Sequence, residues 1–242
     1  ELRKEGISTP IIVLNPEVNG FEELFSKDLE PEVYNFRILD AFIREAERRG
    51  ITNYPIHVKI DTGMHRLGFL PAQIPELLER LKSQKGLQVK SVFSHLAASE
   101  SWMFDSFTQE QIDIIDAAHR EIGEKLGYPV WKHILNSAGI ERFIDAQWDM
   151  VRLGIGLYGV SASGLNGLKN VSTLKTTILQ IQEIPNHETV GYGRKEALNR
   201  DAKIATIRIG YADGLDRKSG NRKGKVWING KYAPIVGNVC MD

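Results

Sequence analysis

Apolar residues follow a helical spacing in three stretches of the first half of the chain. The first stripe begins after Asn35, a typical N-cap residue, and ends at Gly50, a typical helix stop. The apolar positions of the three stripes are Ile38, Leu39, Phe42, Ile43 and Ala46; Ile74, Leu77, Leu78 and Leu81; and Ile112, Ile115, Ile122 and Leu126. This spacing predicts three amphipathic helices, each with one buried face.

Short runs rich in β-branched residues alternate with these helices. Strands are predicted at residues 10–14, 32–34, 56–61, 89–95, 133–136 and 150–158. The alternation predicts parallel βαβ units in an α/β fold, and eight such units would close a (β/α)8 barrel. The chain opens without Met in what reads as the end of a helix, so we expect residues 1–160 to be an N-terminally truncated barrel within a longer protein.

The pattern changes after Tyr158. A Gly- and Ser-containing loop is followed by strand-like runs without long helices, "TILQIQEI", "KIATIRI" and "KVWINGKYAPIV". Asn229-Gly230 in the last run is a typical two-residue hairpin turn. Residues 161–242 are therefore predicted to be the start of an all-β domain that is truncated at Asp242.

Composition narrows the class of protein. The chain has 31 Lys and Arg and 31 Asp and Glu, so a net charge of zero gives no reason to expect nucleic acid or an anionic membrane as partner. Cys240, the single cysteine, excludes an internal disulfide and fits a reducing, cytoplasmic location. We expect no membrane span and no metal site.

The strand in "HVKIDTGMHRLGF" carries an ionisable residue at every second position. Ile56, Val58 and Ile60 suit the side that faces the helices, which turns His57, Lys59 and Asp61 towards the barrel interior. Such residues could form an ion pair that only fills the barrel, or they could line a site at its carboxyl-terminal mouth.

The same alternation in "MVRLGIGLY" turns Arg152, Gly154 and Gly156 inward. Glycines leave room beside an arginine, and Ser137 ends the preceding strand, so these residues favour a phosphate site over plain packing. Asp61-Thr62-Gly63 by itself also matches the motif of an aspartic protease. That chemistry needs two such carboxylates, and the chain has only one copy of the motif.

Seven motifs together resemble the bacterial alanine racemases. "HVKIDTGMHRLGF", "VFSHLA", "NSAG", "MVRLGIGLYG", "TVGYG", "IGYADG" and "APIVGNVCMD" occur in the family's order and cover essentially the whole chain. The resemblance implies an isomerase that converts L-alanine to D-alanine for peptidoglycan precursors, through an external aldimine of pyridoxal 5′-phosphate and two-base proton transfer. It also implies a homodimer whose active sites combine the barrel of one subunit with the β domain of its partner.

The resemblance also implies three catalytic residues. Tyr192 would be the tyrosine base that reaches the partner's site, and Arg152 would contact the pyridine nitrogen of the cofactor. A guanidinium remains protonated, so this nitrogen would stay unprotonated and the ring would be a weaker electron sink. His95 would link Arg152 to Tyr192 and tune the tyrosine as a base.

Substrate and cofactor contacts are implied in the same way. Arg66 would engage the substrate carboxylate, and Met241 and Tyr211 would lie at the substrate-binding site. Ser137, Gly154 and Ile155 would hold the cofactor phosphate.

Lys59 matches a lysine that is carboxylated in many members, and such a carbamate would hold Arg66. Asp61 could instead supply the negative partner with Lys59 unmodified, and His57 is expected only to pack inward.

One family motif is missing. The Schiff-base lysine lies in a Lys-Ala-Asn-x-Tyr-Gly context that the sequence does not contain, so we expect these 242 residues alone to be inactive. Two alternatives stay open at this point: a pyridoxal-phosphate-dependent amino-acid decarboxylase of the same architecture, and a non-catalytic cofactor-binding module.

Overall fold

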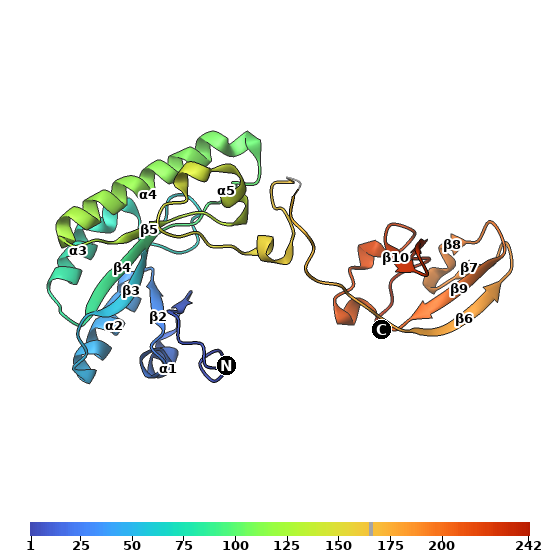
Figure 1. Cartoon of the computed structure of the whole chain (residues 1–242), viewed down its shortest axis with the longest axis horizontal. Coiled ribbons are helices and arrows are strands. Elements are labelled where there is room, and N and C mark those ends of the chain that lie inside the picture. Colours follow the sequence, from blue (N-terminus) through green and yellow to red (C-terminus); the bar gives the residue numbers. More distant parts are fainter. Residues whose placement is uncertain (165–166) are drawn as a thin grey trace. The chain divides into compact units, whose positions relative to one another are not determined.

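A computed structural model describes residues 1–164 and 167–242. The chain divides into two compact units, Glu1–Val171 and Ser172–Asp242, which are described separately here (Figure 1). The first unit continues beyond residue 160 because Glu141 accepts hydrogen bonds from the hydroxyl groups of Ser161 and Ser163.

The first unit is built on a five-stranded parallel sheet (Figure 1). Its strands are β1 (Ile12–Val13), β2 (Glu30–Val33), β3 (Tyr54–Lys59), β4 (Leu87–Phe93) and β5 (Trp131–His133). Their order in space follows their order in the chain. Parallel strands in chain order are the arrangement of a (β/α)8 barrel, whereas a doubly wound sheet reverses direction at a switch point. The predicted barrel architecture thus holds for these strands.

The helices of this unit are α1 (Phe21–Ser26), α2 (Phe36–Arg49), α3 (Ile74–Lys82), α4 (Asp105–Leu126) and α5 (Ser137–Arg142). The three predicted helices are present as α2, α3 and α4, and two short helices that were not predicted, α1 and α5, accompany them. The predicted N-cap of α2 is confirmed, since the Asn35 side chain accepts a hydrogen bond from the Ile38 N–H at 2.9 Å, and Gly50 ends the helix with φ of 65°. None of the helices in the described part of the chain has the length and apolar character needed to cross a membrane.

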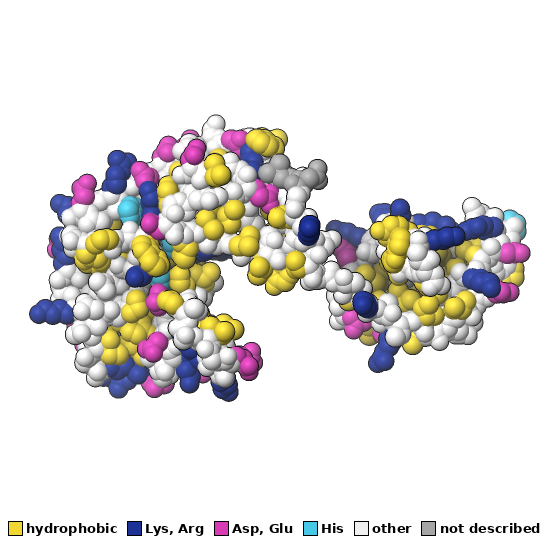
Figure 2. Space-filling model, viewed as in Figure 1, with side chains coloured by type: hydrophobic (Ala, Val, Ile, Leu, Met, Phe, Trp, Pro, Cys, Tyr) yellow, Lys and Arg dark blue, Asp and Glu magenta, His cyan; other side chains and the backbone are white. Residues whose placement is uncertain are grey.

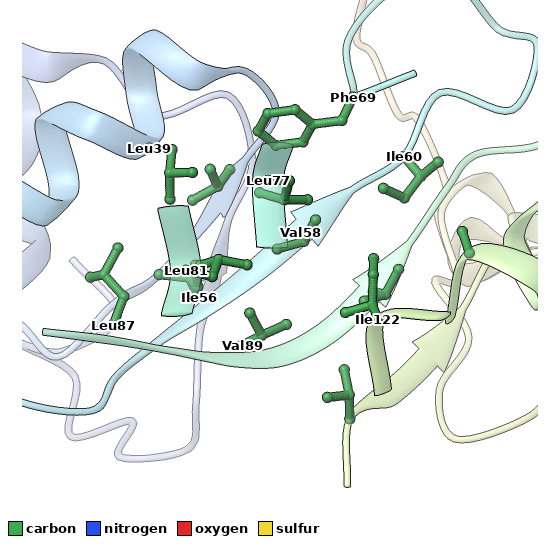
Figure 3. Close-up of a cluster of buried hydrophobic side chains, with 14 of the residues drawn as sticks. Leu39, Ile56, Val58, Ile60, Phe69, Leu77, Leu81, Leu87, Val89 and Ile122 are labelled. Atoms are coloured by element: carbon green, nitrogen blue, oxygen red, sulfur yellow. The ribbon is translucent and has the colours of Figure 1, made fainter. Parts of the chain in front are cut away.

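The hydrophobic core lies between the sheet and these helices. Ile56, Val58 and Ile60 are fully buried there, as the alternation in β3 predicts. Figure 3 shows them together with Leu39 of α2 and Leu77 of α3. Since this face of β3 is sealed by apolar packing, its polar side chains are confined to the opposite face.

The strand predicted at residues 150–158 is wrong. Residues 151–154 have no assigned strand and Ile155–Tyr158 form a short 3-10 helix, η5. The N–H of Arg152 still donates to the carbonyl of Leu135, which follows β5. Beyond it Gly154, with φ −103° and ψ −105°, leaves the extended conformation, and the chain turns so that backbone N–H groups point at Ser137.

The second unit contains three antiparallel strand pairs in its described residues. They join β6 (Ile178–Ile184) to β9 (Ala202–Ile207), β7 (Thr189–Val190) to β8 (Glu196–Ala197), and β10 (Lys225–Ile228) to β11 (Lys231–Pro234). The hairpin predicted at Asn229-Gly230 is confirmed, with φ values of 44° and 77°. Figure 2 shows apolar side chains at the surface of this unit. The exposed apolar residues of the unit include Leu174, Leu179 and Ile181.

Candidate active site

Arg152 occupies the carboxyl-terminal edge of the parallel sheet, where the ends of β4 and β5 meet it. Its Nη2 donates to the carbonyl oxygens of Ser94 and of Ile134, the latter at 3.0 Å. Nη1 donates to Nδ1 of His133. Burial lowers the pKa of Arg152 to about 10, and the carboxylate of Glu32 opposes that shift. The guanidinium therefore stays charged at neutral pH and is fixed by acceptors from β4 and β5.

A continuous hydrogen-bonded chain leads from Arg152 across the polar face of the sheet. Because Nδ1 of His133 accepts from Arg152, its hydrogen is on Nε2, which donates to the Ser91 hydroxyl at 3.0 Å. The Ser91 hydroxyl then donates to Nδ1 of His57 at 2.6 Å, and Nε2 of His57 donates to Glu30 at 2.8 Å. Every donor thus has an acceptor when both histidines are neutral.

The pKa values agree with neutral histidines. Burial and the charge of Arg152 lower the pKa of His133 to about 2. Burial also lowers the pKa of His57, although Glu30 pulls in the opposite direction. A second proton on either ring would place an N–H against a donor that has no other acceptor, so the tautomers of this chain are fixed.

His95 lies on the other side of the same guanidinium. Its Nδ1 is 3.3 Å from Nη2 of Arg152 and accepts from it, so its hydrogen is on Nε2. Burial, followed by the charges of Arg152, Arg66 and Lys59, lowers the pKa of His95 to about 4. Gln111 of α4, fully buried, donates to the His95 carbonyl at 3.1 Å and holds this part of the chain in place. The predicted contact between His95 and Arg152 is present.

Lys59 forms an ion pair with Glu32 of the neighbouring strand. The distance from Nζ to Oε1 is 2.9 Å, and the side chains of Lys59 and Glu32 are 9% and 0% exposed. The aromatic ring of Phe93 lies 5.7 Å from Nζ and 5.1 Å from the guanidinium carbon of Arg152. Lys59 and Arg152 therefore both lie near the ring of Phe93 and near the carboxylate of Glu32.

Asp61 does not pair with Lys59, so an ion pair between these two inward residues is wrong. Its Oδ1 accepts from the backbone N–H groups of Gly63 and His65, each at 3.0 Å. Burial would raise the pKa of Asp61, but these two donors and the His65 ring lower it. The Asp61 carboxylate thus stabilises the turn that follows it. Glu32 is the anion that faces Lys59.

The loop that carries Arg66 folds back tightly onto β3. Phe69 N–H donates to the Lys59 carbonyl and the Asp61 N–H donates to the Phe69 carbonyl, both at 2.9 Å. Gly68 has φ of 133°, and a Cβ there would lie 2.5 Å from the Asp61 nitrogen, so only glycine fits. Arg66 is exposed at the tip, yet close enough to influence His95.

Ser137, Gly154 and Ile155 come together as the sequence predicts. The N–H groups of Gly154 and Gly156 donate to the Ser137 hydroxyl oxygen at 3.0 and 3.1 Å. With both lone pairs engaged, this hydroxyl can offer a further ligand only its hydrogen. The N–H of Ile155 opens the 3-10 turn and has no acceptor within it. The group presents neutral donors, as a phosphate cradle does.

Tyr192, Tyr211 and Met241 belong to the second unit, where one segment connects them. Asn238 donates its side-chain amide to the Tyr192 carbonyl at 3.1 Å. Three residues later, the Met241 carbonyl accepts from the Ala212 N–H at 2.9 Å, next to Tyr211. Tyr192 is 77% exposed, so its phenol is available to a ligand or a partner.

Five polar residues of this region were not predicted from the sequence: Glu30, Glu32, Ser91, Gln111 and His133. Four of them could have been found, because Glu30 and Glu32 alternate with Pro31 and Val33, and Ser91 and His133 share the inward parity of their strands. Gln111 gives no such signal. It stands among the helical residues of α4, and only the packing of that helix makes it buried.

Comparison with known proteins gives concordant results. The family models for the alanine racemase N-terminal and C-terminal domains match residues 1–162 and 171–242. Curated relatives include alanine racemase 2 of Caldanaerobacter subterraneus and the alanine racemase of Thermodesulfovibrio yellowstonii. Each is 36% identical, covers all of this chain, and is itself covered over 63% of its length.

Solved structures agree with these relatives. An alanine racemase from Bartonella henselae with covalently bound pyridoxal phosphate has a TM-score of 0.80 at 27% identity, covering 100% of this chain and 67% of its own. An alanine racemase from Bacillus anthracis with bound L-Ala-P has a TM-score of 0.83 at 27% identity, covering 100% and 63%. On the family models, the relatives and the fold together, the chain belongs to the alanine racemase family.

Proposed function

We propose that the protein containing this chain is an alanine racemase that depends on pyridoxal 5′-phosphate. The chain spans about 63% of the length of the curated relatives it matches, so the activity is proposed for the whole protein. Residues 1–160 would supply the cofactor-binding barrel and residues 161–242 part of the β domain. The proposal rests on family membership and on one observation, the charged Arg152 beside a cradle of neutral donors at one edge of the sheet.

The donors present in the first unit fit the cofactor. Ser137 would hold its phosphate through the hydroxyl hydrogen and Ile155 through its backbone N–H, while Gly154 would shape the turn through its bond to Ser137. Arg152 would face the pyridine nitrogen, since its Nε has no acceptor among the described residues while both Nη atoms are engaged. A permanently charged guanidinium supplies a hydrogen bond but no transferable proton at neutral pH. The ring nitrogen would therefore remain unprotonated.

Pyridoxal 5′-phosphate supplies an electron-withdrawing ring that acidifies the Cα–H bond of a linked amino acid. The residues of this chain then have to hold and move protons. His95 keeps its hydrogen on Nε2 because Nδ1 accepts from Arg152. It could thus donate to the phenolic oxygen of Tyr192 from the partner subunit and favour the phenolate as a base. The base on the opposite face would be the family's lysine.

Substrate recognition is proposed for three residues. Arg66 would bind the carboxylate of alanine by its planar fork, and Met241 would contact the same group through its backbone. Tyr211 would restrict the size of the substrate side chain. The L-Ala-P bound to the Bacillus anthracis structure supports an alanine-sized substrate. We further propose a cytoplasmic homodimer with shared sites that makes D-alanine for the cell wall.

The test is a direct assay of the full-length protein. We expect it to bind pyridoxal 5′-phosphate, to convert L-alanine and D-alanine into each other, and to release no carbon dioxide. Carbon dioxide release without racemisation would instead identify a decarboxylase. Absence of both reactions in a cofactor-loaded protein would contradict the proposal.

A further inference from the structure

The buried pair of Lys59 and Glu32 concerns the chemical state of the lysine. Glu32 and Lys59 lie on adjacent parallel strands, and the register of β2 and β3 pairs Glu32 with His57, two residues before Lys59. Both side chains are on the polar face of the sheet, with Nζ and Oε1 separated by 2.9 Å. The other carboxylate oxygen of Glu32 accepts from the Asn15 N–H at 2.9 Å. The carboxylate is therefore held from both sides.

The remaining charges around Lys59 are known. Arg152 is the other cation near the Phe93 ring, and Glu32 acts on it electrostatically. Lys59 in turn acts on His95, whereas Asp61 is occupied by its own loop. In the described residues Glu32 is thus the carboxylate within ion-pair distance of Lys59, and it is fully buried.

Carboxylation of this lysine would need two changes that Glu32 opposes. The ammonium must first lose a proton, because only the lone pair of a neutral amine can form the N–C bond to carbon dioxide. A second proton leaves nitrogen as the carbamate forms, and the product is an anion. The first change would leave the buried carboxylate of Glu32 without its counter-charge, and the second would place another anion beside it.

We propose that Glu32 is the permanent anion of this site and that it keeps Lys59 as an uncarboxylated ammonium. The negative charge that a carbamate would bring is already present as a glutamate side chain. This inference does not rest on the proposed function, because the state of Lys59 can be read without any assay of racemisation.

The experiment is carbon-13 NMR of the full-length, cofactor-loaded protein equilibrated with ¹³C-labelled bicarbonate. We expect no lysine carbamate resonance in the wild type or in Glu32→Asp, which retains the charge. We expect a resonance in Glu32→Gln, which frees Lys59 from its carboxylate. Glu23→Gln on the exposed side of α1 is the matched control and should match the wild type.

Two outcomes would overturn the proposal. A carbamate resonance in the wild type would show that Glu32 does not exclude the modification. Absence of the resonance from a folded Glu32→Gln protein would assign the exclusion to some other group. If Glu32→Gln does not fold, the wild-type spectrum decides the state of Lys59. The conversion rate of wild type should then also be unchanged in buffer freed of carbon dioxide, and a loss that added bicarbonate restores would contradict the proposal.

Discussion

The hydroxyl oxygen of Ser91 lies 3.0 Å from Nε2 of His133 and receives its hydrogen. Arg152 can only donate to Nδ1 of His133 and so fixes this tautomer, and Ser91 accepts the hydrogen that stays on Nε2. A serine on one strand thereby helps to position the ring that accepts from an arginine at the edge of the sheet, although the serine and arginine side chains do not touch.

Ser91→Ala is expected to lower the free energy of unfolding by about 1–3 kcal/mol, since it leaves buried ring nitrogens of His57 and His133 without a partner. It should also reduce the rate of alanine racemisation, because Arg152 loses its fixed acceptor. Urea denaturation and the racemase assay measure the two effects. Ser83→Ala, an exposed serine after α3, is the control. Equal stability of both variants would contradict the role of Ser91.

Stability is expected to fall as the pH drops below about 6.5. In the folded chain the pKa of His133 is lowered to about 2 and that of His95 to about 4, from 6.5. Between pH 6.5 and each of these values, the unfolded chain therefore binds more protons than the folded chain. The loss approaches about 1.4 kcal/mol per pH unit for His133 and is smaller for His95, which is partly exposed. Denaturation at a series of pH values measures the slope. His133→Asn should flatten it and His65→Asn, an exposed histidine, should not. If the stability of the wild type did not change with pH in this range, the conclusion that His133 and His95 are buried as neutral rings would be contradicted.

Ser137→Ala is expected to weaken the binding of pyridoxal 5′-phosphate by about tenfold, the value of one hydrogen bond of about 1.4 kcal/mol. The variant removes the hydroxyl and also the acceptor that holds Gly154 and Gly156. Equilibrium dialysis of the full-length protein gives the dissociation constant, with Ser26→Ala on α1 as the control. Pyridoxal, which lacks the phosphate, should bind the wild type and Ser137→Ala equally. A tenfold loss of pyridoxal binding in Ser137→Ala would argue against a phosphate contact.

Tyr192→Phe is expected to lower kcat by about 10²–10⁴-fold, as for removal of a general base. Cofactor binding and thermal stability should be unchanged, because the Tyr192 side chain is 77% exposed in its unit. Tyr232→Phe is a matched control, with its tyrosine 70% exposed in the same unit. Retained racemase activity in Tyr192→Phe would remove this tyrosine from the mechanism.

The periodic parts of the fold were predictable from the sequence. Helix α2 begins after Asn35 and ends at Gly50, as predicted. The alternation in β3 correctly placed Val58 and Lys59 on opposite faces of the sheet. These signals are local, since a cap or a two-residue period can be read from adjacent positions. The strand prediction for residues 150–158 was wrong because their apolar alternation resembles that of a strand. Two glycines instead let the backbone turn towards Ser137.

The partners of the charged residues were harder to predict. Lys59 was expected to have a negative neighbour, but whether this is Asp61 or Glu32 depends on the pairing of two strands separated by a helix. The direction of the hydrogens from Arg152 to Glu30 likewise depends on contacts between four strands. Sequence spacing identifies residues on one face, and tertiary contacts decide which of them meet.

The backbone return at Gly68 makes the segment from Lys59 to Phe69 close upon itself, and Thr62 within it is also bonded to Ser94 and Gln111. If this segment were grafted onto the corresponding strand of another barrel, the residues that contact Thr62 should have to be transferred with it to keep the placement of its arginine. Insertions within it would be poorly tolerated, so natural variation in loop length is expected elsewhere around the rim.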